Sequence, residues 1–184
     1  MRQRSGERSS RNEQVPQNDQ VPQNDGAGQN DGARQNEHQD PAPANAASVV
    51  IERRIEWMDT DAAGQHHNTA ITRLVESAEA ALHRNLGIVD ETFGRTPRVR
   101  AETNFRGRLR FDDLVRVELR VDDVGRTSLR YGFAVHRGCE LVADGSLVIV
   151  CFDAAREVAV EWPAHQRALL LGRNARDVRR SGID

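Results

Sequence analysis

The sequence predicts an α+β domain in which one long amphipathic helix accompanies an antiparallel sheet of about five strands. Apolar residues recur with helical spacing between residues 71 and 82, and they alternate with polar residues in segments on both sides of that stretch. Strongly apolar residues are also concentrated after residue 48 of the 184-residue chain. We therefore expect one core of ordinary size rather than two.

The N-terminal segment differs in composition from the rest of the chain. It contains no Ile, Leu, Phe, Trp or Tyr before residue 49. A Gln-Asn-acid tripeptide recurs every six residues, at positions 17–19, 23–25, 29–31 and 35–37. So little apolar surface cannot offset the entropy lost on folding, about 1–2 kcal/mol per residue for the backbone. We expect a disordered tail over residues 1–46, a domain over 47–175 and a flexible C-terminus over 176–184.

Charge and cysteine content narrow the possible classes of protein. The formal net charge of −2 gives no indication of a nucleic-acid partner. The longest apolar run, residues 147–152, is too short to span a bilayer, and the N-terminus lacks the apolar segment of a signal peptide. Cys139 and Cys151 cannot form a disulfide framework. We expect a cytoplasmic protein that binds neither nucleic acid nor membrane.

The first elements of the domain are a strand, a loop and the helix. The strand is predicted from alternation over residues 49–56, and a loop follows over 58–64. The apolar positions of the helix share one face: Ile71, Leu74, Val75, Ala78 and Leu82. We expect the helix to begin near His67 or Asn68 and to end before Gly87, which suits the left-handed residue that follows many helices.

Four further strands are predicted after Pro97. Three alternate in polarity, over residues 99–105, 115–121 and 129–135, with hairpin turns at Gly125-Arg126 and Arg137-Gly138. Residues 147–152 are apolar throughout, so we expect a central strand covered on both faces. A single helix cannot cover such a sheet. We therefore expect a homodimer, possibly assembled further into a dimer of dimers.

Three segments carry a resemblance to a known family. Residues 54–64 read RIEWMDTDAAG, with Asp-x-Asp-x-x-Gly between the strand and the helix. Residues 105–113 read FRGRLRFDD, and 124–128 read VGRTS. In this order they resemble the 4-hydroxybenzoyl-CoA thioesterase family, over about residues 49–163. The resemblance implies a hotdog fold, in which the sheet wraps the helix, and hydrolysis of an acyl-CoA thioester to free acid and CoA.

The same resemblance implies roles for residues around the start of the helix. Asp61 matches the acid that serves as nucleophile or general base, a role that suits a partly desolvated carboxylate. Gly64 permits close approach of the substrate. The backbone N–H of Asn68 matches an oxyanion donor, which suits the unpaired amides of a helix N-terminus. The alternative for Asp61 is a turn residue whose oxygens are held by nearby amides.

A second hotdog subgroup, the phenylacetate-pathway thioesterases, implies two more residues. Its Asn-x-x-Gly-x-x-His pattern and helix acid place a histidine on His67 and an acid on Glu76. His67 would then orient the thioester carbonyl while Glu76 activates water. The alternatives are a plain histidine at the helix start and a solvated glutamate paired with Arg73.

Recognition of CoA is weakly encoded. Arg126, Thr127 and Ser128 match the family's phosphate-contact position and offer a cation, hydroxyls and turn amides. The alternative is an ordinary hairpin turn.

On the helix, we expect His83 to pair with Glu79, four residues earlier.

Two other functions remain open at this point. One is a non-catalytic acyl-CoA-binding module. The other is a dehydratase or hydratase of the same fold, which needs Asp-x-Asn-Pro-x-His or His-x-x-Pro, and neither string occurs within the expected domain over residues 47–175. We expect neither a metal nor an organic cofactor, because the adjacent His66 and His67 diverge in direction and no further ligands complete a tetrahedral set.

Overall fold

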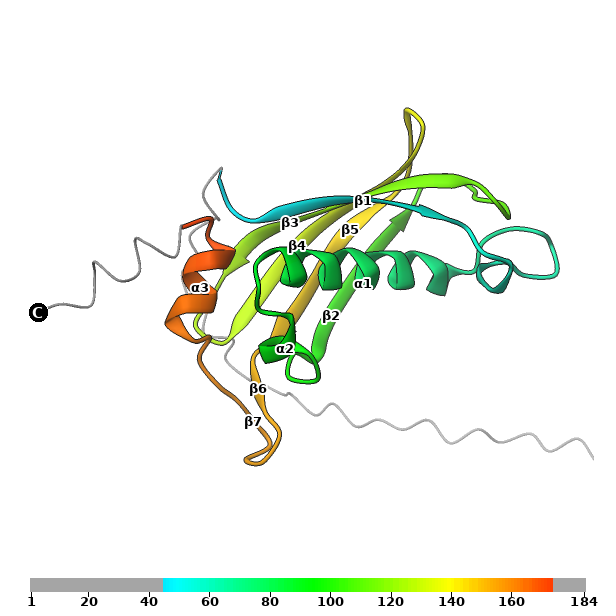
Figure 1. Cartoon of the computed structure of the whole chain (residues 1–184). Coiled ribbons are helices and arrows are strands. Elements are labelled where there is room, and N and C mark those ends of the chain that lie inside the picture. Colours follow the sequence, from blue (N-terminus) through cyan, green and yellow to red (C-terminus); the bar gives the residue numbers. More distant parts are fainter. Residues whose placement is uncertain (1–44, 174–184) are drawn as a thin grey trace, which may run out of the picture. The chain divides into compact units, whose positions relative to one another are not determined.

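The computed structural model describes residues 45–173 (Figure 1). The expectations for the tail up to residue 44 and for residues 176–184 lie outside this range. The elements in chain order are β1 (Ser48–Arg54), the 3-10 helix η1 (Trp57–Asp59), α1 (Asn68–Asn85), α2 (Val89–Thr92), β2 (Arg98–Phe105), β3 (Leu114–Val124), β4 (Ser128–Arg137), β5 (Glu140–Val150), β6 (Phe152–Asp153), β7 (Val158–Ala159) and α3 (Ala164–Leu170).

Five strands form one antiparallel sheet in the order β1-β3-β4-β5-β2. The predicted hairpin turns are confirmed. Between β3 and β4 the Gly125 amide donates to the Ser128 carbonyl at 2.9 Å, and between β4 and β5 Gly138 has a φ of 59°. The α+β class and the five-stranded antiparallel sheet are therefore confirmed.

The strand predicted over residues 147–152 differs from expectation in three ways. It begins at Glu140 and ends at Val150, while Phe152 belongs to the separate hairpin of β6 and β7. It is an interior strand, but β4 holds the centre of the sheet. Only one of its faces is buried in the chain, because Leu147 and Ile149 are buried whereas Val148 and Val150 are half-buried.

Helix α1 has the predicted limits and the predicted buried face. His67 is its N-cap, Asn68 its first residue, and Gly87 follows it with a φ of 71°. The five apolar positions of the predicted stripe are all buried, and α1 lies across one face of the sheet, in contact with β1 and β3 (Figure 1). Burying one such Leu or Ile side chain contributes about 1.5–3 kcal/mol.

Two short helices and one small hairpin were not predicted. Helix α3 follows Pro163, which sits at its N-cap, and buries Ala168 and Leu170. A proline before an apolar-patterned segment was a usable signal for this helix. Helix α2 and the two-residue strands β6 and β7 are too short to show a periodicity.

Strand β2 is an edge strand that the described part of the chain leaves largely uncovered. All its residues except Thr103 are exposed, including Val99 at 59% and Phe105 at 50%. It pairs with β5 on one side, and no described strand pairs with its other side. A long exposed edge is a ready surface for strand pairing with another chain.

Candidate active site

The loop before α1 is anchored by Asp59. This carboxylate is buried and accepts hydrogen bonds from the Arg73 side chain (Nε to Oδ1, 2.7 Å) and from the Glu56 amide (2.8 Å). Burial alone would raise the pKa of Asp59, but the Arg73 and Glu56 donors hold it below its ordinary value. Asp59 thus ties η1 to the second turn of α1.

Asp61 is exposed and shapes the turn that leads into α1. Its Oδ1 accepts from the amides of Ala63 at 2.8 Å and Gln65 at 3.3 Å. Gly64 has a φ of 70°, which favours glycine, and its amide donates to the Asp61 carbonyl at 2.9 Å. The Oδ2 atom makes no hydrogen bond within residues 45–173. The Asp61 carboxylate therefore serves the turn with one oxygen, while the other has no hydrogen-bond donor among the described residues.

The N-terminus of α1 adjoins a cavity of about 370 Å³. Its lining comes from the helix start and from the link after β2: His66, Asn68, Phe105, Arg106, Gly107 and Arg108. The backbone amides of Asn68 and Thr69 find no acceptor in the part of the chain that the structure describes. Unpaired amides at the start of an 18-residue helix are suited to a developing negative charge.

Two histidines flank this helix start in different ways. His67 is exposed, and only its backbone is engaged: the amide donates to the Asp59 carbonyl at 2.7 Å. His66 is half-buried. Its Nδ1 accepts from the Leu109 amide at 3.0 Å, and its ring lies 6.1 Å from that of Phe105. Burial lowers the pKa of His66, although the negative charge of Asp61 opposes the shift. His66, which the sequence left without a role, thus lines the cavity.

A second, larger cavity of about 730 Å³ lies along the C-terminal half of α1. Its charged lining residues are Glu76, Glu79 and Arg98. Arg98 Nη2 donates to Glu79 Oε2 at 2.7 Å and lies 3.4 Å from Glu76 Oε1. The alternative considered for Glu76, a pair with Arg73, does not form, because Arg73 turns back toward Asp59.

His83 is buried at the edge of the same cavity, and its expected pairing with Glu79 is also wrong. Its Nδ1 lies 2.8 Å from Thr92 Oγ1 and its Nε2 lies 2.7 Å from the Tyr131 hydroxyl. Burial lowers the pKa of His83 to about 4, so the ring is neutral near pH 7. These contacts cross to α2 and β4, which helical spacing alone cannot foresee.

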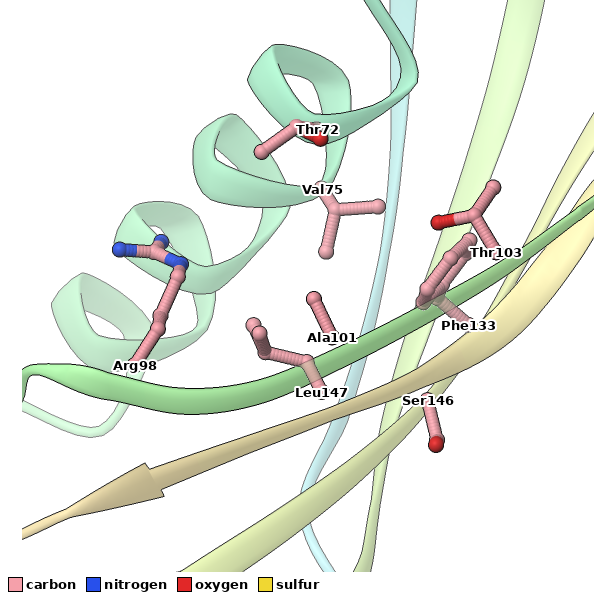
Figure 2. Close-up of a pocket in the computed structure, with 8 residues that line it drawn as sticks. All are labelled: Thr72, Val75, Arg98, Ala101, Thr103, Phe133, Ser146 and Leu147. Atoms are coloured by element: carbon pink, nitrogen blue, oxygen red, sulfur yellow. The ribbon is translucent and has the colours of Figure 1, made fainter. Parts of the chain in front are cut away.

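A narrow apolar gap separates α1 from β2 between the two cavities. Figure 2 shows Thr72 and Val75 of α1 facing Ala101 and Leu147, with the Arg98 guanidinium directed at the helix. The gap measures only about 20 Å³, which is room for about one water-sized group. Helix and edge strand therefore stand slightly apart along this stretch.

The expected CoA-binding turn lies away from the helix start. Arg126 is exposed and pairs with Glu161 at 3.1 Å, while the Thr127 carbonyl accepts from the Cys151 amide at 2.9 Å. The turn follows the last residue of β3, whereas the loop near Asp61 adjoins its first residues. The 11 residues of this extended strand separate them by about 33 Å.

Within one chain the predicted site residues thus form three groups. Asp61, Gly64, His67 and Asn68 are gathered at the helix start. Glu76 lies two turns further along α1, about 12 Å by helical rise. The turn at 126–128 lies at the far end of the sheet. Among residues 45–173, no three His, Cys, Asp or Glu side chains are grouped so that they could hold a metal ion.

The fold defines a class of α+β domain that recurs among solved structures described as thioesterases. A predicted thioesterase from Bacillus stearothermophilus superposes with a TM-score of 0.62 at 22% identity, covering 67% of this chain and 94% of that one. A 1,4-dihydroxy-2-naphthoyl-CoA thioesterase from Synechocystis gives 0.60 at 17% identity, covering 67% and 95%. A thioesterase complexed with coenzyme A and Zn from Thermus thermophilus gives 0.62 at 22% identity, covering 67% and 93%.

The family model for the thioesterase-like superfamily matches residues 55–170, and the chain belongs to this superfamily. The resemblance found in the sequence is thereby confirmed. No curated protein matches the sequence. Within residues 45–173, no helix has both the length and the apolar character needed to cross a membrane.

Proposed function

We propose that the protein hydrolyses an acyl-CoA thioester to a free acid and CoA. The observation that carries the proposal is the pair of unpaired amides at Asn68 and Thr69, which follow the loop that holds Asp61. Of the two residues, Asn68 also lines the smaller cavity. A thioester carbonyl placed there would have its oxygen stabilised by the Asn68 N–H as negative charge develops. A preorganised donor of this kind contributes on the order of 10²–10³ in rate.

The Asp61 carboxylate supplies the second element of the mechanism. It either attacks the carbonyl carbon or removes a proton from the attacking water. The carbon–sulfur bond then breaks, the CoA thiolate leaves and takes up a proton, and water provides the oxygen of the new acid. His67 is exposed at the same helix start, where it orients the carbonyl, and Gly64 leaves room for the substrate beside the loop.

Glu76 enters the mechanism through a second copy of the chain. It lies too far along α1 to share one carbonyl with Asp61 within a chain. The edge strand β2 joins the two cavities, since Phe105 at one end lines the smaller and Arg98 at the other lines the larger. Antiparallel pairing of two β2 edges would bring Phe105 of one copy opposite Arg98 of the other. Each site would then combine Asp61 of one chain with Glu76 of its partner in a homodimer.

We propose CoA as the group that carries the acyl chain. Of the similar structures, one is described as a thioesterase of a CoA ester and another as a complex with coenzyme A. Arg126, Thr127 and Ser128 remain the proposed phosphate contacts, since the turn is on the surface and the Arg126 side chain is 63% exposed. Cys139 and Cys151 are free, which supports a reducing, cytoplasmic setting. The proposal requires no metal and no organic cofactor.

A non-catalytic acyl-CoA-binding module is the second candidate. It is favoured by the ion pairs of Arg98 with Glu76 and Glu79, and by the use of one Asp61 oxygen in a turn. Such a module would bind acyl-CoA and leave the thioester intact.

The two candidates are separated by incubating the protein with a panel of acyl-CoAs and measuring released thiol. We expect turnover by the wild type and a loss of at least about a hundredfold in kcat for Asp61→Asn, the usual scale for an acid–base group. Asp153→Asn is the matched control, because Asp153 Oδ1 also accepts two amides, those of Ala155 and Arg156. Equal turnover in both variants would remove Asp61 from catalysis, and binding without thiol release would favour the module.

A further inference from the structure

Much of the wall of the larger cavity is apolar. Its apolar side chains come from α1, α2, the segment before β2 and the region of β6: Ala80, Val89, Phe93, Pro97, Phe152 and Ala154. Phe93 is 85% exposed in the chain although it lines this cavity. A cavity of about 730 Å³ with such a lining has the size and the character of a pocket for a small organic ligand.

The neutral polar groups on the wall are bonded to one another. The Thr92 hydroxyl donates to the Ile88 carbonyl at 3.0 Å, so it accepts from His83 Nδ1, and His83 Nε2 accepts from the Tyr131 hydroxyl. The Thr96 hydroxyl donates to the Thr92 carbonyl at 3.3 Å. Both ring nitrogens of His83 and the hydrogens of both threonine hydroxyls are therefore engaged within the chain. This part of the wall has few donors left for a ligand.

The charged end of the cavity has no cation to spare for an anionic ligand. Arg98 is the only cation among the described residues that line the cavity. Its Nη2 donates to Glu79 at 2.7 Å and lies 3.4 Å from Glu76. Because two carboxylates already face this one guanidinium, a third carboxylate brought by a ligand would meet repulsion and would lose its hydration without gaining a partner.

The position of the cavity relative to β2 indicates which ligand would reach it. Arg98, at the first residue of β2, lines the larger cavity, and Phe105, at the last, lines the smaller one beside Asn68. Antiparallel pairing of two β2 edges would therefore set the helix start of one copy beside the larger cavity of the other. The acyl group of a thioester held at Asn68 of one copy would extend toward that cavity.

We propose that the larger cavity binds the acyl group of the substrate and selects uncharged, largely apolar acyl groups over those that end in a carboxylate. The proposal rests on the proposed function, because the thioester at the helix start of one copy delivers the acyl group to the cavity of the other. An apolar chain gains free energy by leaving water for contact with Val89, Phe93 and Phe152. A terminal carboxylate would have to compete with Glu76 and Glu79 for Arg98.

The first test compares pentanoyl-CoA with glutaryl-CoA, whose acyl groups have the same number of carbons but differ in the terminal carboxylate. We expect kcat/KM for thiol release by the wild type to be at least about a hundredfold higher for pentanoyl-CoA, because a carboxylate without a partner is costly to bury. Calorimetric titration of the full chain with each compound measures the same preference in binding, and it does so without requiring turnover.

The second test narrows the cavity. Ala80 and Ala81 are neighbouring, half-buried residues of α1, and of the two only Ala80 lines the cavity. Ala80→Leu should lower kcat/KM for octanoyl-CoA by about tenfold or more and leave that for acetyl-CoA nearly unchanged, because only the longer chain extends along the cavity. Ala81→Leu is the matched control and should leave the ratio of the two substrates as in the wild type. Binding of the uncharged dye N-phenyl-1-naphthylamine, followed by fluorescence, should weaken in Ala80→Leu alone.

Three results would overturn the proposal: glutaryl-CoA bound as tightly as pentanoyl-CoA, no binding of either compound, or equal effects of Ala80→Leu and Ala81→Leu. Failure of the proposed function gives a different result. Preferential binding of pentanoyl-CoA that depends on Ala80, without thiol release from any acyl-CoA, would support the acyl pocket and refute hydrolysis.

Discussion

At the scale of single residues, the sequence allowed candidate residues to be named, but it did not allow the residues that they contact to be predicted. Asp61 and Asn68 could be singled out because a short motif and a helix start are local in sequence. The Arg98 pair with Glu79 and the His83 contact with Tyr131 join residues far apart in the chain. Helical spacing offers only i+3 and i+4 partners, and for His83 that choice was wrong.

His83 gives a prediction about stability and pH. Its pKa is about 4 in the folded protein and about 6.5 in the unfolded chain. The unfolded state therefore binds more protons between these values, so the histidine's contribution is complete above pH 6.5 and falls as the pH drops toward 4. The difference amounts to about 3 kcal/mol. Urea unfolding at about pH 7.5 and about pH 4.5 should show a larger loss for wild type than for His83→Gln, which cannot titrate.

The comparison with His83→Gln removes the contributions of other groups to the pH dependence. Glu79, for example, has a raised pKa and opposes the trend as it takes up a proton. An equal loss of unfolding free energy in both proteins would show that His83 titrates normally in the folded state.

At the scale of elements, the limits of a helix or strand could be predicted when the element was long and its pattern of apolar and polar residues was repeated several times. Helix α1 and the strands from Arg98 to Arg137 contain several periods each, and their limits were anticipated within a few residues. Strand β5 could not be delimited, because its middle contains Asp144, Gly145 and Ser146, which interrupt the apolar run. The exposure of β2 could not be predicted either, because alternation of apolar and polar residues does not distinguish an edge strand from an interior strand.

We expect that two copies of the chain would pair through the free edge of β2. Val99→Glu places a charge on this edge and should convert dimers into monomers, with loss of thiol release if the site is shared. Val50→Glu is the matched control, because Val50 lies on the opposite edge strand β1 and is similarly exposed, at 55%. Light scattering coupled to gel filtration measures both masses. A dimer that survives Val99→Glu but not Val50→Glu would place the interface on β1.

At the scale of the whole molecule, a single chain holds Asp61 and Glu76 apart, whereas the proposed mechanism needs both acids at one site. The helix start with Asp61 adjoins one end of β2, and the cavity with Glu76 adjoins the other. The sequence indicated that one helix could not cover the sheet, and the described residues leave β2 uncovered. The sequence did not indicate which strand would be exposed or that its ends would line different cavities, because both depend on strand order. A pair of copies joined along β2 would cover the exposed edge and bring the two acids together.

The central claim is that a thioester is hydrolysed at a site built by two copies of the chain, and mixing inactive subunits tests it most directly. Asp61→Asn and Glu76→Gln proteins are each expected to be inactive alone. After unfolding and refolding together, about half of the dimers are mixed, and each mixed dimer has one of its two sites with both acids intact. The account predicts thiol release at roughly a quarter of the wild-type rate in the mixture, and a mixture as inactive as its two components would contradict it.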